Sequence, residues 1–141
     1  MRLRLDVDGE PLAPGAAVSG RVVVEEGGRA RSLSVRLAFV ERTESFEKVA
    51  RDAGTLAVAE GDLAGGDVAA FSLRLPDDAP PNIATRYGRI GWEVRARVDR
   101  AGPDTTVDRP IELLRGYTAP RLTGRGGRVA EGTRLLSEYG V

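Results

Sequence analysis

The chain has 141 residues, 21 of them basic and 21 acidic, and it contains neither cysteine nor histidine. These absences exclude disulfides, thiolate zinc sites, cysteine nucleophiles and Ser-His-Asp triads, while the length fits a single domain. The zero net charge argues against nucleic acid as a partner, because nucleic-acid-binding domains carry a strong basic surface.

The N-terminal stretch MRLRLDVDGE alternates charged and apolar residues, whereas a signal peptide would have an apolar run. No window of the sequence approaches the ~18 consecutive apolar residues that a membrane-spanning helix needs. We therefore expect a cytoplasmic protein without a transmembrane segment. The abundance of Arg, Ala and Gly indicates the coding composition of a GC-rich bacterial genome.

A two-residue periodicity marks the first third of the chain. Residues 2–7 alternate apolar and charged side chains, which predicts a half-buried strand, and a loop rich in Pro and Gly leads to a second strand at 17–26. The pair Gly27 and Gly28 predicts a tight hairpin into a third strand at 31–41, since glycine supplies the positive φ of primed turns. The side chains expected to face the core are Leu3, Leu5, Val7, Val18, Val22, Val24, Leu33, Val35, Leu37 and Phe39.

The middle of the chain has a weaker periodicity. Within TESFEKVARDAG we expect a strand over 45–50, followed by a short strand at 55–60 and a loop rich in Gly and Asp at 61–67. A further strand at 68–75 ends at Pro76, because proline cannot donate to a sheet ladder. The inward side chains of that strand are expected to be Phe71, Leu73 and Leu75.

The clearest alternation surrounds the single tryptophan, in residues 90–100. We expect Trp92 to be a core anchor between two sheets, since large aromatic side chains fill the interiors of sandwiches. A turn at 101–104 then leads to a last strand at 105–114. The predicted inward residues are Trp92, Val94, Ala96 and Val98, and the predicted outward residues are Glu93, Arg95, Arg97 and Asp99.

Seven or eight short strands with turn signals every 8–12 residues predict an all-β fold, an antiparallel β-sandwich of the immunoglobulin-like type, over residues 1–114. No amphipathic helix links consecutive strands, which disfavours a parallel α/β sheet. Residues 115–141 differ in character. They begin with RGYTAPRLTGRGGR, expected to be a Gly/Arg-rich linker, and end with VAEGTRLLSEYGV, where apolar spacing predicts a short C-terminal helix.

Two segments resemble the arrestin N-terminal fold family, which includes bacterial sporulation-control (Spo0M-like) and Vps26-like relatives. They are GEPLAPGAAVSGRVVVEEGG and FSLRLPDDAPPNIATRYGRIGWEVRARVD, and the resemblance covers about residues 2–114. Asn82 stands where the family usually has Ser, and Trp92 where it usually has Tyr. The residues that match the family's motifs are Pro14, Gly15, Val18, Gly20, Val22, Val24, Leu75, Pro76, Pro80, Pro81, Gly88, Ile90, Val94, Ala96, Val98 and Asp99.

The resemblance implies a non-enzymatic adaptor or scaffold for protein–protein interaction, with a regulatory role in bacteria linked to sporulation or stress. Arrestin-type proteins commonly carry two tandem sandwiches, whereas this chain has room for one, so a homodimer could take the place of the second. The phosphate-sensing lysines of true arrestins are absent, since Lys48 is the single lysine. Exposed sheet edges would permit the addition of a partner's strand.

Arginines on an outward strand face and apolar residues in the tail are the candidate contacts with a protein partner. Arg95 and Arg97, extended by Arg36 on another strand, form a row suited to an anionic ligand, although alternating charges on an exposed sheet face are also ordinary. The full set of candidate partner-binding residues is Arg95, Arg97, Arg125, Arg128, Leu135, Leu136 and Tyr139.

Two other functions stay open. A module that binds an anionic lipid or ligand is the alternative to the adaptor, and a small enzyme based on Asp, Glu and Arg is the third. Adjacent carboxylates in an extended strand point to opposite faces and make poor acid–base dyads, so we predict no catalytic residue. The acidic loops at 6–10 and 61–67 lack the spacing of an EF-hand, and we predict turns there, with no metal or cofactor.

Overall fold

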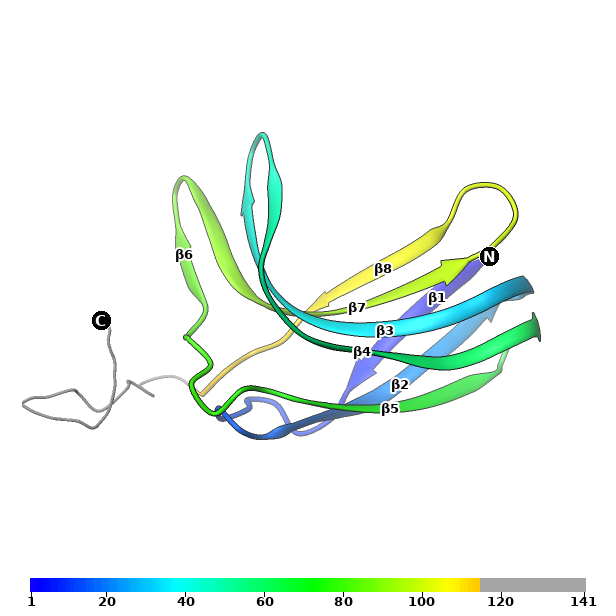
Figure 1. The fold of residues 1–141 in the computed structure, drawn as a ribbon, viewed down its shortest axis with the longest axis horizontal. Coiled ribbons are helices and arrows are strands. Elements are labelled where there is room, and N and C mark those ends of the chain that lie inside the picture. Colours follow the sequence, from blue (N-terminus) through cyan, green and yellow to red (C-terminus); the bar gives the residue numbers. More distant parts are fainter. Residues whose placement is uncertain (115–141) are drawn as a thin grey trace, which may run out of the picture.

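The fold consists of two antiparallel sheets packed face to face, in a computed structural model that describes residues 1–114 (Figure 1). One sheet has three strands in the order β1-β2-β5, which are β1 (Arg2–Val7), β2 (Ala17–Glu26) and β5 (Val68–Arg74). The other has five strands in the order β4-β3-β7-β6 with β8 also on β7, which are β3 (Gly28–Thr43), β4 (Glu47–Leu63), β6 (Ile83–Thr85), β7 (Gly88–Asp99) and β8 (Thr105–Pro110). The predicted antiparallel sandwich is confirmed.

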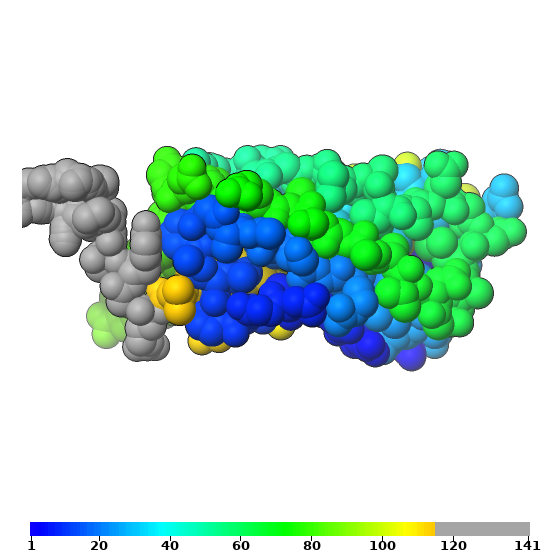
Figure 2. Space-filling model, turned by 90° about the horizontal axis from the view of Figure 1, so that it is seen from below, coloured from blue at the N-terminus to red at the C-terminus, as the bar shows by residue number. Residues whose placement is uncertain are grey.

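The core lies between the sheets and is built from alternate side chains along the strands, those that point inward. Trp92 on β7 is fully buried and packs beside Phe39 of β3, with 5.0 Å between the ring centroids. Its predicted role as the anchor of the core is therefore confirmed. Nearly all of the predicted inward residues are buried, except that Val7 and Leu73 pack against the core from partly exposed positions. Figure 2 shows the outer face of the three-stranded sheet, with β1 and β2 in blue beside β5 in green.

The predicted hairpin at Gly27 and Gly28 is wrong. β2 pairs with β1 and β5, whereas β3 pairs with β4 and β7, so the chain crosses here from one sheet to the other. Neither glycine has a positive φ. Gly27 is needed for a different reason, since a Cβ atom at this position would lie 2.1 Å from the backbone oxygen of Leu63. A close backbone approach, which the sequence alone does not reveal, accounts for this glycine.

Most of the strand predicted at 45–50, the strand predicted at 55–60 and part of the loop at 61–67 belong to one long strand, β4, which begins at Glu47. Its pairing with β3 shifts register at several bulges, and at one of them Gly54 has φ +123° and donates its N–H to the Asp52 carboxylate at 2.9 Å. Bulges of this kind hide a strand from a search for strict alternation. The last strand, β8, ends at Pro110 and not at 114, and the three-residue strand β6 was not predicted.

Two neighbouring hairpins, β3–β4 and β6–β7, bend away from the body of the sandwich (Figure 1). They lie side by side because Thr43 on β3 pairs with Gly88 on β7. Bulges in the β3–β4 pairing between Arg36 and Val40 coincide with the bend, as expected from the way that bulges curve a strand. Since the hairpins bend away from the three-stranded sheet, the outer face of the five-stranded sheet is concave at the bend.

The predicted linker and short helix of residues 115–141 lie outside the described residues, and so do five of the seven candidate partner-binding residues, namely Arg125, Arg128, Leu135, Leu136 and Tyr139. Residues 1–114 include no helix with the length and apolar character needed to cross a membrane.

Candidate functional site

A cluster of ion pairs fills the concave outer face at the bend, and we call it the bend cluster. At its centre Arg42 of β3 binds Glu93 of β7 with two parallel hydrogen bonds, 2.8 Å from Nε to Oε2 and 2.6 Å from Nη2 to Oε1. Arg42 also contacts Glu47 of β4 and reaches Asp108 of β8 at 3.1 Å. The bend cluster therefore joins four strands through the side chains of Arg42, Glu47, Glu93, Arg95 and Asp108.

Arg95 completes the bend cluster, and its charge is paired with two carboxylates of the cluster. Its guanidinium donates to Asp108 at 3.0 Å and to Glu47 at 2.6 Å. The hydrogen bond from Arg95 holds the pKa of the Glu47 carboxyl below its ordinary value, and Glu93 raises the pKa of Arg42 in the same way. Glu47, Arg42 and Arg95 are therefore charged near neutral pH, and each is paired with an opposite charge within the protein.

The outer row of arginines predicted from the sequence exists, but its members bind carboxylates of the chain itself. Arg97 donates from Nε to Asp104 at 2.9 Å, and Arg36 lies 2.9 Å from Asp52 on β4. Each arginine of the row therefore already has a carboxylate of the chain as its ion-pair partner. The binding of a partner by Arg95 and Arg97 stays a prediction, and it would require an exchange of these ion pairs.

The bend cluster has a structural consequence. Ala38 and Val40 of β3 point to the outer face by alternation, yet both are buried and neither belongs to the core between the sheets. Glu93 lies opposite Ala38 and is itself 2% exposed, the one buried charged residue within residues 1–114. Burial of a carboxylate is tolerated when its hydrogen bonds are satisfied, as the paired donors of Arg42 ensure.

The edge of β7 is interrupted beside the bend. β6 pairs with Gly88 to Ile90, β8 pairs with Glu93 to Val98, and both lie on the same edge of β7. Asn82 bridges the gap, since its Oδ1 accepts the backbone N–H of Trp92 at 3.0 Å and its Nδ2 donates to the Ile111 carbonyl at 2.7 Å. The indole of Trp92 donates to the Pro80 carbonyl at 3.0 Å.

Gly91 lets the Asn82 bridge form. A Cβ atom at this position would lie 2.9 Å from Asn82 Oδ1, too close for the side-chain amide to keep its place. Asn82 is the residue that departs from the Ser usual in the arrestin-like motif, and its side chain reaches both Trp92 on β7 and Ile111 just after β8. The departure therefore has a structural role in this protein.

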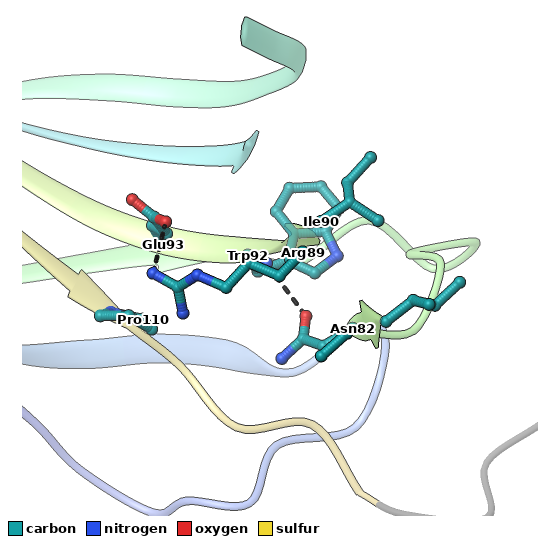
Figure 3. A pocket seen from close by; sticks show the side chains of 9 residues that line it. Asn82, Arg89, Ile90, Trp92, Glu93 and Pro110 are labelled. Atoms are coloured by element: carbon teal, nitrogen blue, oxygen red, sulfur yellow. Dashed lines mark hydrogen bonds and ion pairs between the residues drawn. The ribbon is translucent and has the colours of Figure 1, made fainter. Parts of the chain in front are cut away.

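The gap opens into a pocket of about 170 Å³ between β6 and β8 (Figure 3). Arg89 extends along the pocket toward Glu93, with Asn82 on the opposite side and the Trp92 indole behind it (Figure 3). The pocket combines charged, amide and aliphatic groups, and the main side chains that line it are Asn82, Ile83, Arg89, Ile90, Glu93 and Pro110.

Arg89 differs from the other arginines of this face. Its one ion pair within residues 1–114 is a 3.5 Å contact with Glu93 Oε2, an oxygen that already accepts from Arg42. Its cross-strand neighbours are Ala84 on β6 and Arg42 on β3, and neither supplies a carboxylate. The Arg89 side chain is 49% exposed, so it can meet a ligand from solvent.

Large apolar side chains are exposed on the two hairpins. Phe46 follows the β3–β4 turn and is 49% exposed, while Ile83 and Tyr87 on the β6–β7 hairpin are 53% and 72% exposed. We call these three residues the hairpin patch. Arg86 stacks over the Tyr87 ring at 4.9 Å and donates to its hydroxyl at 2.7 Å, which adds a cation to the patch.

The sequence did not single out Arg89, Glu93 or the hairpin patch. Alternation places Glu93 on the outer face, which is right, but gives no sign that the bend buries it. Arg89 and Arg95 look alike in the sequence, and only the residues opposite them distinguish the two. A weak signal was present in Gly91, an interior glycine in a well-patterned strand, which often marks a close approach.

In the loop at 61–67, which was considered for calcium, the carboxylates bind groups of the chain itself. Asp67 accepts the backbone N–H of Ala64 at 2.8 Å, which shapes the turn, and Asp62 forms an ion pair with Arg29 at 3.1 Å. In the part of the chain that the structure describes, no three acidic side chains converge on a common point as a cation site would require.

The sequence matches no known protein family and no curated protein sequence. The fold, however, is similar to the crystal structure of Spo0M, a sporulation control protein from Bacillus subtilis, with a TM-score of 0.59 and 17% identity over 79% of this chain. The match covers 48% of the Spo0M chain, so this protein spans about half the length of that relative. The predicted Spo0M-like, arrestin-type sandwich is confirmed as a fold.

Proposed function

We propose that the protein is a non-enzymatic adaptor that binds a protein partner through the hairpin end of its five-stranded sheet. The observation that carries this proposal is the hairpin patch, in which Phe46, Ile83 and Tyr87 are exposed on two neighbouring hairpins. Exposed large apolar side chains that gather on one surface mark interaction sites more often than chance. Aromatic residues and arginine are also the types enriched in protein interfaces.

The base of the hairpins supports a role in recognition, because it holds the tips in place. The Asn82 side chain ties the start of the β6–β7 hairpin to Trp92 and Ile111, and the bend cluster joins β3, β4, β7 and β8 below the tips. A binding surface that is ordered before the partner arrives loses less conformational entropy on association. The hairpins thus combine exposed apolar tips with a fixed base.

The charged groups support binding over catalysis. A general acid or base works best with a pKa near the pH of the reaction, whereas Arg95 moves the pKa of Glu47 away from neutrality. Glu93 is held in a bidentate ion pair by Arg42. Both carboxylates are thus held in ion pairs with arginines of the chain, which suits a structural cluster.

Affinity capture with the full chain tests the proposal. The double variant Phe46→Ser/Tyr87→Ser removes the aromatic rings of the hairpin patch, and Val68→Ser is a matched control because Val68 is also exposed but lies on β5, in the other sheet. We expect a set of proteins that the wild type and the control retain and the double variant loses. Recovery of the same proteins by the double variant would contradict the proposal.

The likeness in fold to a sporulation control protein supports a regulatory role in the cytoplasm of a bacterium, linked to sporulation or stress. This finer assignment can be tested by deletion of the gene in its host and measurement of spore yield and stress survival. Complementation with the wild type but not with Phe46→Ser/Tyr87→Ser would tie the phenotype to the hairpin patch. An unchanged phenotype in the deletion strain would remove the regulatory assignment.

An anionic lipid surface is the second candidate partner, and the β6–β7 hairpin is the observation that favours it. Between Ile83 and Ile90 this hairpin carries Arg86 and Arg89 and no acidic residue, next to the exposed Tyr87. Co-sedimentation with phosphatidylserine vesicles that disappears in high salt, and is absent with phosphatidylcholine vesicles, would favour lipid over protein.

The native mass measured in the same buffer tests the predicted homodimer.

A further inference from the structure

The pocket between β6 and β8 exists because two strands share one edge of β7 without meeting. β6 ends its pairing at Ile90 and β8 begins at Glu93, and the Asn82 side chain satisfies the backbone of Trp92 between them. The backbone of the gap is thus already hydrogen-bonded, so a ligand in the pocket would meet side chains. The side chain with the most free hydrogen-bonding capacity there is Arg89.

The guanidinium of Arg89 has five N–H donors, and none forms a hydrogen bond within residues 1–114. Its 3.5 Å contact with Glu93 gives it electrostatic attraction, while Arg42 supplies the hydrogen bonds to that carboxylate. The bend cluster without Arg89 contains two arginines and three carboxylates, so Arg89 balances its charge from the edge. Arg86 on the same hairpin adds a further positive charge.

The rest of the pocket is largely aliphatic. Ile83 and Ile90 are cross-strand partners on β6 and β7, and both line the pocket together with Arg89, Ala84 and Pro110. A volume of about 170 Å³ has room for a carboxylate together with a short aliphatic side chain. The aliphatic side chain would lie against these residues. A guanidinium beside an aliphatic wall is suited to planar, bidentate recognition of a carboxylate.

We infer that this pocket binds a carboxylate of the partner protein that is flanked by an aliphatic side chain, with Arg89 as its ion-pair partner. The inference rests on the proposed function and names the chemistry of the partner. The carboxylate approaches from the exposed side of Arg89, so the guanidinium separates it from Glu93, which is the like charge in the pocket. The hairpin patch provides the adjoining apolar contact.

The single tryptophan makes a direct test possible, because its indole N–H gives one signal in the ¹H–¹⁵N spectrum of the labelled full chain and lies at the pocket. The probes are acetyl-leucine, with a terminal carboxylate, acetyl-leucyl-glutamyl amide, with a side-chain carboxylate, and acetyl-leucine amide, with none. Inorganic phosphate is a fourth probe. We expect saturable shifts of the Trp92 and Gly91 signals with at least one carboxylate probe and none with the amide.

Two variants assign the binding to Arg89. Arg89→Gln should weaken the affinity for the carboxylate probe about tenfold. Arg97→Gln, on the same strand but paired with Asp104, should leave that affinity unchanged. In Ala84→Glu the new carboxylate stands directly opposite Arg89 and should compete with the probe within the protein. This variant adds a group at an exposed position and so does not depend on the loss of Arg89.

The inference is overturned if neither carboxylate probe gives saturable shifts at the pocket, if the amide or phosphate binds as well as the carboxylates, or if Arg89→Gln and Ala84→Glu bind like the wild type. These outcomes are separate from failure of the adaptor role. Capture that is intact in the wild type and lost in Phe46→Ser/Tyr87→Ser would still support the adaptor, while absence of probe binding would remove only the pocket as its contact.

Discussion

The two halves of the outer face of the five-stranded sheet use the same residue types in opposite ways. At the bend, Arg42 and Arg95 each bind carboxylates from neighbouring strands and are half buried with them. At the hairpin end, Arg89 stands in the same alternating strand but faces Ala84 and Arg42. The residue across the strand therefore decides whether an arginine supports the fold or remains available to a ligand.

The end point of β8 sets this difference. β8 brings Asp108 opposite Arg95, and the strand ends at Pro110, opposite Glu93. Beyond that point β6 takes over the edge of β7 with three residues, Ile83 to Thr85, none of them acidic. Arg95 thus has Asp108 of β8 as a partner in addition to Glu47 of β4, whereas no acidic residue of β6 stands opposite Arg89.

The largest effect is expected from Glu93, at the buried centre of the bend cluster. Glu93→Gln replaces a buried carboxylate, which accepts two hydrogen bonds from Arg42, by an amide whose NH2 group faces the guanidinium donors. It should lower the free energy of unfolding by about 3 kcal/mol, because hydrogen bonds to a charged group are lost and buried donors are left without an acceptor. Urea denaturation measures it. Glu44→Gln, in the exposed turn of the β3–β4 hairpin, is the control and should change stability by less than about 0.5 kcal/mol.

Gly91 should give the next largest effect, because a side chain there displaces the Asn82 amide. Gly91→Ala should cost about 2 kcal/mol of unfolding free energy through the loss of the hydrogen bonds to Trp92 and Ile111. In a double-mutant cycle with Asn82→Ala, the glycine substitution should have little further effect. Fully additive losses would show that Gly91 acts independently of the Asn82 bridge.

Arg95→Gln and Arg89→Gln compare the two halves of the face directly. Loss of Arg95 removes its contacts with Asp108 and Glu47 and should lower the unfolding free energy by about 1 kcal/mol. Loss of Arg89, which is half exposed and makes one long contact, should cost less than about 0.5 kcal/mol. Equal losses in the two variants would mean that Arg89 is as much a part of the bend cluster as Arg95.

The smallest effect is expected from acid titration of Glu47. Its pKa in the folded protein is lowered from the ordinary 4.5 by Arg95, so its stabilising contribution is fully present above that pH and is lost as the pH falls through the folded value. Unfolding measured between pH 7 and pH 3 should show a shallower acid limb for Glu47→Gln than for the wild type. Parallel curves below pH 4.5 would contradict this assignment.

The sequence predicts the sandwich well because the dominant force, burial of alternate side chains, leaves a local pattern. Val18, Val22, Trp92 and Val94 are core residues for that reason. The errors have non-local causes. The glycine at position 27 is fixed by a backbone from another strand, and the continuity of β4 is concealed by bulges at which alternation slips by one residue.

The candidate site was less predictable, because its properties depend on register. Arg89 and Arg95 have the same local pattern, and the difference between them lies in Ala84 and Asp108, which are distant in sequence and come opposite them only in the folded sheet. The hairpin patch is similar, since Phe46 and Tyr87 are brought together by the pairing of Thr43 with Gly88. Such neighbours follow from the fold and not from spacing along the chain.

Nuclear magnetic resonance of the guanidinium groups distinguishes arginines bound to carboxylates from an arginine available to a ligand. Hydrogen-bonded Nε–H protons exchange slowly with water, so the account predicts protected Nε–H signals for Arg42 and Arg95 and fast exchange for Arg89 in the free protein. An Arg89 signal as protected as that of Arg42, or an Arg95 signal that exchanges as fast as that of Arg89, would contradict it.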